Sequence, residues 1–340
     1  MKKTIILMLV LITTYASHAQ KSICIAFYNQ ENLFDTIDDP HKNDNEFLPT
    51  SKKEWNTEKY LNKLQNMSKV ISSINDNKAP DIIGMAEVEN KEMAQALTST
   101  ELLKKHKYTV VHFESPDERS IDNALLFKSS QFKLISATPV PVILSDFPNV
   151  NTRDILMVRL EQKKKPKSQV VVLVNHFPSR LGGEKKSEPK RWGAAQILRN
   201  VCDSLFANNP QENIVIMGDF NDEPTNSSMD SVLRAKASAY DLNNGNLFNA
   251  MYEMKLNNEG SYLYRGHYEM LDQIILSSSI TYCSGTLFYE KSSATVYKQD
   301  WMLEQEGKYK GSPKRTYAGN KFLNGYSDHL PVYIYLNFKK

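Results

Sequence analysis

The sequence predicts an α+β protein in which two packed β-sheets are covered by helices on the outside. Nine apolar runs of the kind found in strands buried on both faces point to this fold class. Only three segments show helical periodicity, which is too few to wind around a single sheet. The expected strands are residues 23–28, 82–86, 108–113, 123–127, 155–160, 170–174, 214–217, 271–276 and 332–336.

The expected helices are amphipathic. Apolar residues at spacings of three, four and seven predict a helix over residues 60–74 and a shorter one over 93–97. A third apolar stripe covers residues 192–205, with Ser187 as the expected N-cap and Pro189 in the first turn.

The first 19 residues are typical of a secretory signal. Two lysines precede an apolar run over residues 5–12, and small residues follow, so we expect cleavage after Ala19. The run is too short to span a membrane, which takes ~20 residues. We therefore expect an exported protein, periplasmic or secreted, with no membrane span. Residues 20–340 show no linker or repeat and are interpreted as one domain, and we expect a monomer.

Composition and charge limit the class of protein. The 340 residues are 41% hydrophobic and 24% charged, which excludes a disordered chain. The formal net charge of +3 falls to +1 without the two lysines of the signal. So small a charge does not indicate a nucleic-acid binder, and an anionic substrate has to be held locally by a metal or a few side chains.

Three cysteines, Cys24, Cys202 and Cys283, form no C-x-x-C pair. Neither a disulfide scaffold nor a zinc knuckle is indicated. Cys24 and Cys202 fall in apolar patterns and are expected in the core, and one disulfide among the three stays open.

Polar residues stand at the ends of six apolar strands, where a rigid scaffold can bring them to one rim. Single residues of this kind also occur in turns and helix caps. No complete calcium loop, serine-hydrolase elbow or multi-histidine zinc motif is present. The polar residues are Asn29, Glu87, Asn175, His176, Asp219, Asn221, Asp272, Asp328 and His329.

Together these residues fit hydrolysis of a phosphate ester. Glu87 with the Asn29 amide is a sparse set of oxygen ligands that suits Mg²⁺, with Mn²⁺ or Ca²⁺ as alternatives. Asp219 is a candidate to orient and deprotonate water. The remaining requirements are donors for the phosphate oxygens, help for the leaving oxygen and an acidic partner for a histidine. The candidates for these roles are Asn221, His176, His329 and Asp272.

Six segments in this order resemble the endonuclease/exonuclease/phosphatase superfamily, whose fold is that of deoxyribonuclease I. The likeness extends from Phe27 to Pro331 and is nearest to exported bacterial members. It implies a four-layer α/β/β/α sandwich with two mixed β-sheets and the site at one edge of the sheet pair. The segments are FYNQENLFD from Phe27, MAEVEN from Met85, VNHFPSR from Val174, MGDFNDEP from Met217, LDQIILS from Leu271 and YSDHLP from Tyr326.

The resemblance also implies roles for single residues. Glu87 matches the metal-binding glutamate, Asn29 the amide beside the metal, and Asp328 an aspartate near it. His176 matches a residue that contacts phosphate or assists the leaving group. Asp219 and Asn221 match the family's GD-x-N aspartate and asparagine, which act on the nucleophilic water and the phosphate. Asp272 matches the aspartate that pairs with the last histidine, His329. The proton acceptor is either Asp219 or the pair of His329 and Asp272, and we favour Asp219.

The substrate class stays open among phosphate esters: nucleic acid, nucleotide, or a lipid or sugar phosphate. We expect a phosphodiesterase or nuclease, with a phosphomonoesterase or a non-catalytic binding module as alternatives. Asn175, Arg180 and Arg119 are the expected substrate-binding residues, although either arginine can instead form a structural salt bridge.

Overall fold

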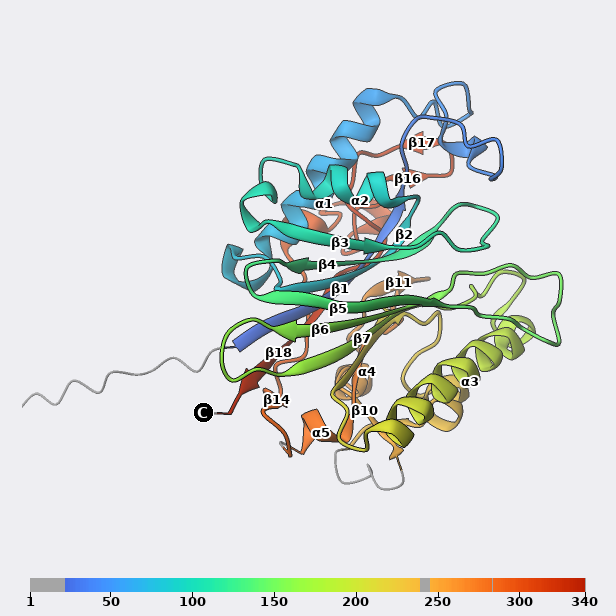
Figure 1. Ribbon diagram of the computed structural model, residues 1–340. Helices are drawn as coiled ribbons and strands as arrows, with labels where there is room; N and C mark the ends of the chain where they lie inside the picture. Colours follow the sequence, from blue (N-terminus) through green and yellow to red (C-terminus); the bar gives the residue numbers. More distant parts are fainter. Residues whose placement is uncertain (1–21, 239–244, 283, 340) are drawn as a thin grey trace, which may run out of the picture.

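The computed structural model describes residues 22–238, 245–282 and 284–339, so the expected signal segment lies outside the described residues. The described chain contains two mixed β-sheets, which confirms the fold class (Figure 1). The first sheet has the order β14 (Leu287–Tyr289), β18 (Val332–Phe338), β1 (Ser22–Leu33), β2 (Ile82–Val88), β4 (Asp122–Lys128) and β3 (Tyr108–His112), with β15 (Thr295–Val296) also pairing with β18.

The second sheet is also mixed. Among its longer strands, one neighbouring pair, β7 with β8, is parallel. Its order is β5 (Phe132–Val140), β6 (Ile155–Gln162), β7 (Gln169–His176), β8 (Ile214–Asp219), β13 (Asp272–Leu276), β10 (Leu247–Asn249) and β9 (Ala235–Lys236).

Three apolar clusters define the four layers. One contains residues of both sheets and forms the core between them. A second lies between the first sheet and the helices α1 (Thr57–Asn77) and α2 (Lys91–Thr98), and a third lies between the second sheet and α3 (Glu184–Asn208). Figure 1 shows α1 and α2 outside one sheet and α3 outside the other. Each sheet therefore buries both faces, which explains its apolar strands.

The helix over residues 60–74 is confirmed. Asn56 caps α1 by accepting a hydrogen bond from the Lys59 amide at 3.0 Å. Its buried stripe includes Met67 and Ile71, as the spacing predicts. The backbone leaves helical geometry at Ile74 and ends in left-handed residues.

Helix α3 begins earlier than expected, because Gly183 is its N-cap. Ser187 lies inside the helix, where its hydroxyl donates to the Gly183 carbonyl at 2.8 Å, so the expected cap is wrong. Pro189 consequently lies beyond the first turn. Arg191 on this helix is buried and pairs with Asp222 at 2.7 Å.

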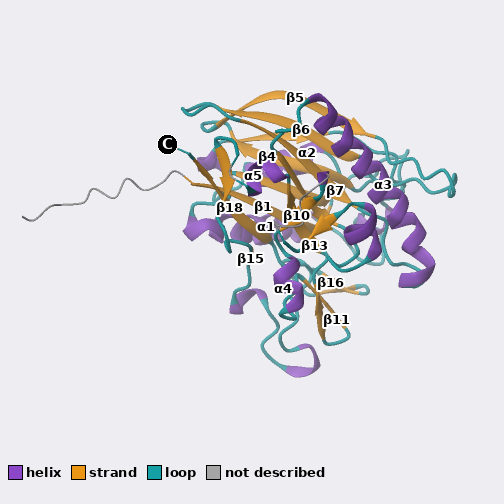
Figure 2. Ribbon diagram, turned by 90° about the horizontal axis from the view of Figure 1, so that it is seen from below, coloured by secondary structure: helices purple, strands orange, loops and turns teal. Residues whose placement is uncertain are grey.

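Sequence periodicity missed β5 and the shortest strands. β5 is a sheet edge with mostly exposed or half-buried residues, so it lacks an apolar run. Two hairpins, β11 (Tyr262–Tyr264) with β12 (His267–Glu269) and β16 (Tyr317–Ala318) with β17 (Lys321–Phe322), lie outside the sheets on the same side of them (Figure 2). Short helical turns complete the chain: 45–47, 104–106, 228–232, 300–302, 307–309, α4 (Tyr252–Leu256) and α5 (Ser278–Thr281).

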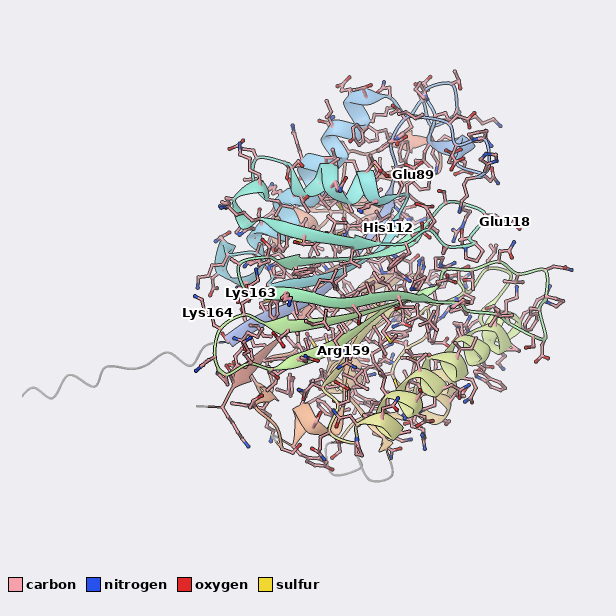
Figure 3. The ribbon with its side chains drawn as sticks, viewed as in Figure 1. Glu89, His112, Glu118, Arg159, Lys163 and Lys164 are labelled. Atoms are coloured by element: carbon pink, nitrogen blue, oxygen red, sulfur yellow. The ribbon has the colours of Figure 1, made fainter. Side chains whose placement is uncertain are left out.

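Cys24 and Cys202 are buried and unpaired, as expected for core residues, and Cys283 lies outside the described residues. No helix among the described residues has the length and apolar character needed to cross a membrane. Lys163 and Lys164 lie in the exposed turn between β6 and β7, at the far end of β7 from His176 (Figure 3).

Candidate active site

The ends of central strands from both sheets meet at a cavity of about 860 Å³. From the first sheet, β1 carries Asn29 and β2 carries Glu87. From the second sheet, β7, β8 and β13 carry His176, Asp219 and Asp272. The register pairs His176 with Asp219 and Asp219 with Asp272, so these three residues lie side by side. The structure thus brings the strand-end residues of distant segments together.

Gly218 allows the close contact between β7 and β8 beside Asp219. It lies opposite Asn175, and a Cβ at this position would clash with the Asn175 carbonyl. The buried Asn175 amide donates to the carbonyls of Leu173 and Met217 at 3.0 and 3.3 Å. Asn175 is not among the described residues that line the cavity, and its expected role in substrate binding stays a prediction. Its amide holds β7 against β8.

Asp219 is a buried carboxylate surrounded by polar groups. Its Oδ1 atom accepts a hydrogen bond from the Asn221 amide at 2.9 Å. Its Oδ2 atom lies 3.1 Å from Asn29 Nδ2, 3.6 Å from His176 Nε2 and 3.7 Å from His329 Nε2. Burial raises the pKa of Asp219 to about 7, although the charge on His329 opposes the shift. A carboxylate with such a pKa is well suited to accept a proton near neutral pH.

His329 and Asp272 form a tight pair, with 2.6 Å between His329 Nδ1 and Asp272 Oδ2. Burial disfavours the imidazolium, but Asp272 and Asp219 outweigh burial and raise the pKa of His329 well above its usual value. His329 is therefore cationic at neutral pH, and its Nδ1–H donates to Asp272. The Tyr262 ring packs against the imidazole with centroids 4.8 Å apart.

His176 has the opposite character. Burial, together with the charges of Arg153 and Arg119, lowers the pKa of His176 well below its usual value. Its Nε2 atom lies 3.8 Å from Glu87 Oε1. The site therefore contains one neutral and one charged imidazole, which can play different roles towards the same phosphate.

Glu87 is a partly exposed carboxylate at the cavity. Its side chain is 16% exposed and lines the cavity. Its Oε2 atom accepts from the Asn32 amide at 3.0 Å, while Oε1 has a long 3.4 Å contact with Asn29 Nδ2. The Asn29 Oδ1 atom is taken by the Glu31 amide at 2.9 Å, so Asn29 turns its N–H groups towards Glu87 and Asp219. Asn29 thus orients these carboxylates, and its expected place beside a metal stays a prediction.

Asn221, Arg180 and Arg119 all line the cavity. The Asn221 Nδ2 atom donates to the Phe177 carbonyl at 3.1 Å. Arg180 is held in the wall by hydrogen bonds to the Asn221 carbonyl at 2.7 Å and to Glu269 at 3.0 Å. The Arg119 side chain is about half exposed, with Nε 3.6 Å from Asp117. Both arginines can therefore reach a ligand in the cavity.

Asp328 also lines the cavity, in a charged group that the sequence did not reveal. Arg315 pairs with Asp328 and with Glu31, the latter at 3.4 Å. Burial raises the pKa of Glu31 to about 7 and lowers the pKa of Lys63 to about 8. Lys63 lies on the buried face of α1, so a lysine within an apolar stripe was the available signal. Arg315 stands outside any strand or helix and gave none.

Sequence comparison assigns the chain to a known protein family. A family model described as "Endonuclease/Exonuclease/phosphatase family" matches residues 24–338. Among curated proteins, the comparison finds no match.

Solved structures share the fold at low sequence identity. The mannosyl-6-phosphatase Bt3783 of Bacteroides thetaiotaomicron VPI-5482 is 14% identical, with a TM-score of 0.56 over 93% of this chain and 100% of that chain. The D. rerio TDP2 complexed with single strand DNA product is 13% identical, with a TM-score of 0.54 over 93% and 99%. The human Nocturnin catalytic domain is 19% identical, with a TM-score of 0.51 over 94% and 95%. At these identities the likeness concerns the fold alone.

Proposed function

Because the chain belongs to the endonuclease/exonuclease/phosphatase family of metal-dependent phosphoester hydrolases, we propose that it cleaves a P–O bond by in-line attack of water. The observation that carries this proposal is the position of Asp219. Its buried carboxylate faces the cavity between a neutral histidine, His176, and a cationic one, His329. A base beside two imidazoles of different charge fits hydrolysis of an anionic ester.

The roles follow from the charge states. Asp219, with a pKa of about 7, accepts the proton of the attacking water. His329, kept charged by Asp272, offsets negative charge on the phosphoryl oxygens. His176 is neutral and donates a hydrogen bond to a phosphate or leaving oxygen. Asn221 lies beside Asp219 in the cavity wall and contributes to phosphate positioning.

The donor set fits a hard divalent cation. Glu87 offers a partly exposed carboxylate oxygen to the cavity, and Asp328, which pairs with Arg315, lines the same cavity. Mg²⁺ typically binds through one or two carboxylates and completes its shell with waters and substrate phosphate. When bound, the cation would polarise the phosphoryl oxygen and stabilise developing charge. Mn²⁺ or Ca²⁺ suits the same oxygen ligands.

The cavity favours a small phosphate ester over a long nucleic acid. Its wall combines acidic residues with a smaller set of lysine and arginine residues, whereas a nucleic-acid groove is basic. The two hairpins outside the sheets contribute Tyr262, Tyr264 and Tyr317 to the wall. The substrate we propose is therefore compact, such as a nucleotide or a phosphorylated sugar.

The test is hydrolysis of bis(p-nitrophenyl) phosphate, p-nitrophenyl phosphate and single-stranded DNA, each with Mg²⁺ and with EDTA. Mg²⁺-dependent turnover of either small ester supports the proposal, and the preferred one distinguishes phosphodiesterase from phosphomonoesterase. Cleavage of DNA alone would contradict the small-substrate proposal. No Mg²⁺-dependent turnover of any of them would favour the binding module.

We also propose that the protein is exported, on the strength of its first 19 residues. The test is expression of the full chain in a bacterium, followed by fractionation and N-terminal sequencing. A mature chain starting at Gln20 outside the cytoplasm is expected, and an uncleaved cytoplasmic chain would contradict export.

A further inference from the structure

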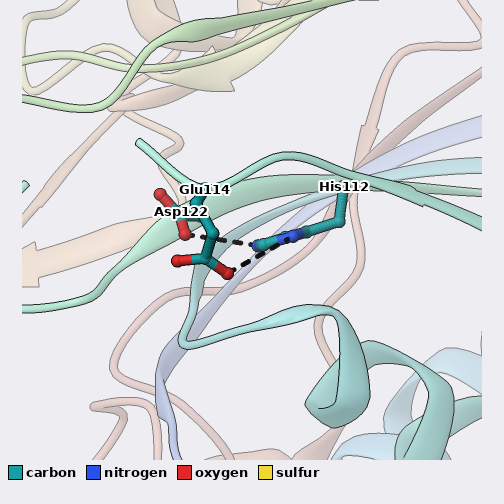
Figure 4. A group of neighbouring side chains, drawn as sticks. All are labelled: His112, Glu114 and Asp122. Carbon is teal, nitrogen blue, oxygen red and sulfur yellow. Dashed lines mark ion pairs between the residues drawn. The ribbon is translucent and has the colours of Figure 1, made fainter. Parts of the chain in front are cut away.

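A second group of metal-ligating side chains lies at the connection between β3 and β4. His112 ends β3, Asp122 begins β4, and Glu114 follows β3. The register pairs His112 with Ala124, so His112 and Asp122 point to the same side of the sheet. Ala124 packs in the apolar layer under the helices α1 and α2, which places both side chains on the sheet's outer face. Figure 4 shows the three side chains converging.

The spacing of these groups suits one small cation. His112 Nε2, the nitrogen that would bind the cation, lies 3.3 Å from Asp122 Oδ2. One ligand atom from each residue lies within 4.8 Å of the others. Ligands bound to Zn²⁺ at about 2.0–2.2 Å are roughly 3–3.6 Å apart. The exposed Glu114 side chain, whose Oε1 atom lies 3.9 Å from the other ring nitrogen, His112 Nδ1, would turn towards Nε2 to complete such a set.

Two buried atoms of the group are left unsatisfied. The His112 and Asp122 side chains are 2% and 1% exposed. His112 Nε2 and Asp122 Oδ2 contact each other at 3.3 Å, but neither atom completes a hydrogen bond within the described part of the chain. Asp122 Oδ1 is used by the Ser115 amide at 2.9 Å. Buried polar atoms in native proteins are nearly always satisfied, so these two point to a ligand between them.

We infer that His112, Glu114 and Asp122 bind a divalent cation of the class that accepts imidazole, represented by Zn²⁺, at a site separate from the catalytic one. Mg²⁺ and Ca²⁺ prefer oxygen ligands alone, whereas Zn²⁺ takes imidazole and carboxylates and can complete its shell with water. None of these three residues is among the described residues that line the catalytic cavity.

The site would fasten residues 113–121 to the sheet. This segment carries Asp117, which pairs with the buried Arg153 at 3.0 Å, and Arg119, which lines the catalytic cavity. Cation binding is therefore expected to raise the thermal stability of the protein and to leave the chemical step to the catalytic residues.

Calorimetric titration of the purified protein with ZnCl₂, in excess Mg²⁺, tests the inference. The variants are Glu114→Gln and, as a matched control from the same segment, Glu118→Gln, whose side chain is exposed (Figure 3). Glu114 is 56% exposed, so its substitution leaves the core intact. We expect one Zn²⁺ site in the unmodified protein and in Glu118→Gln, and binding weakened about tenfold or more in Glu114→Gln. Equal Zn²⁺ binding in all three proteins would overturn the inference.

A second pair of variants separates this site from the catalytic metal. Glu87→Gln is expected to keep the Zn²⁺ site and the Zn²⁺-dependent rise in melting temperature, whereas His112→Gln is expected to lose both. Zn²⁺ binding that disappears in Glu87→Gln and persists in Glu114→Gln would assign the ion to the catalytic cavity and refute the second site. Because binding and melting are measured without substrate, the outcome does not depend on the proposed function.

Discussion

Asp219 and Asp272 lie directly opposite each other on the antiparallel strands β8 and β13, and both carboxylates face the imidazole of His329. Two buried carboxylates on paired strands repel each other when both are charged, and the positive charge of one imidazolium offsets this repulsion. Their roles differ because Asp272 holds His329 Nδ1 at 2.6 Å, whereas Asp219 Oδ2 stays 3.7 Å from His329 Nε2 and faces the cavity. The first is a positioning residue, and the second is free to act on water.

Asp219→Asn is expected to lower kcat by about 10³-fold or more, because the amide cannot accept the proton of water. The fold should survive, since the change removes a buried charge and keeps the size of the side chain. Steady-state kinetics and circular dichroism measure the two effects. Asp146→Asn, at an exposed position, is the control. Full activity in a folded Asp219→Asn protein would eliminate Asp219 as the base.

Asp272→Asn is expected to lower kcat by about 10²-fold and to lower the pKa of His329. In the native protein Asp272 and Asp219 outweigh burial, so losing the nearer carboxylate leaves burial dominant and favours the neutral ring. NMR titration of the imidazole signals measures this shift, which a merely structural role of Asp272 would not produce. An unchanged His329 titration would contradict the assignment.

Removal of divalent cations by EDTA is expected to abolish activity, and added Mg²⁺ should restore it. Glu87→Gln should raise the Mg²⁺ concentration for half-maximal activity about tenfold or more, since it removes a carboxylate charge from the site. Glu184→Gln is the matched control, because Glu184 lines the same cavity and is half exposed. The metal assignment fails if both variants respond to Mg²⁺ alike.

Glu89→Gln is expected to stabilise the protein at alkaline pH. Burial raises the pKa of Glu89 from 4.5 to about 8, and Asp35, Asp44 and Glu114 add to the shift. The folded state thus keeps a proton that the unfolded state loses above about pH 4.5, so native stability falls as the pH rises from about 4.5 to 8.

The variant lacks this ionisation, so its advantage should be small at pH 4.5 and grow by up to about 1.4 kcal/mol for each pH unit between 4.5 and 8. Urea unfolding at both pH values measures the difference. Glu259→Gln, at an exposed position, should show little change. A Glu89→Gln advantage that is the same at both pH values would contradict the raised pKa.

The layered fold and the location of the site could be predicted from the sequence because both depend on local pattern. Apolar runs marked the strands, and polar residues at their ends, such as Glu87 and Asp219, marked the rim where they meet. The same reasoning failed for β5, an edge strand with mostly exposed or half-buried residues, and for the start of α3, where a serine in the first turn resembled a cap.

The sequence by itself determined which residues stand at the strand ends and that those strands are buried on both faces. Only the tertiary structure decided the charges and orientations of the groups: the cationic His329, the neutral His176, and the Asn29 amide with its N–H groups towards Glu87 and Asp219. These properties come from burial and from partners far along the chain. Asn29 meets Asp219 across 190 positions, and His329 meets Asp272 across 57. No local pattern encodes such distances, because the dielectric environment and the neighbours of a side chain exist only once the sheets have packed.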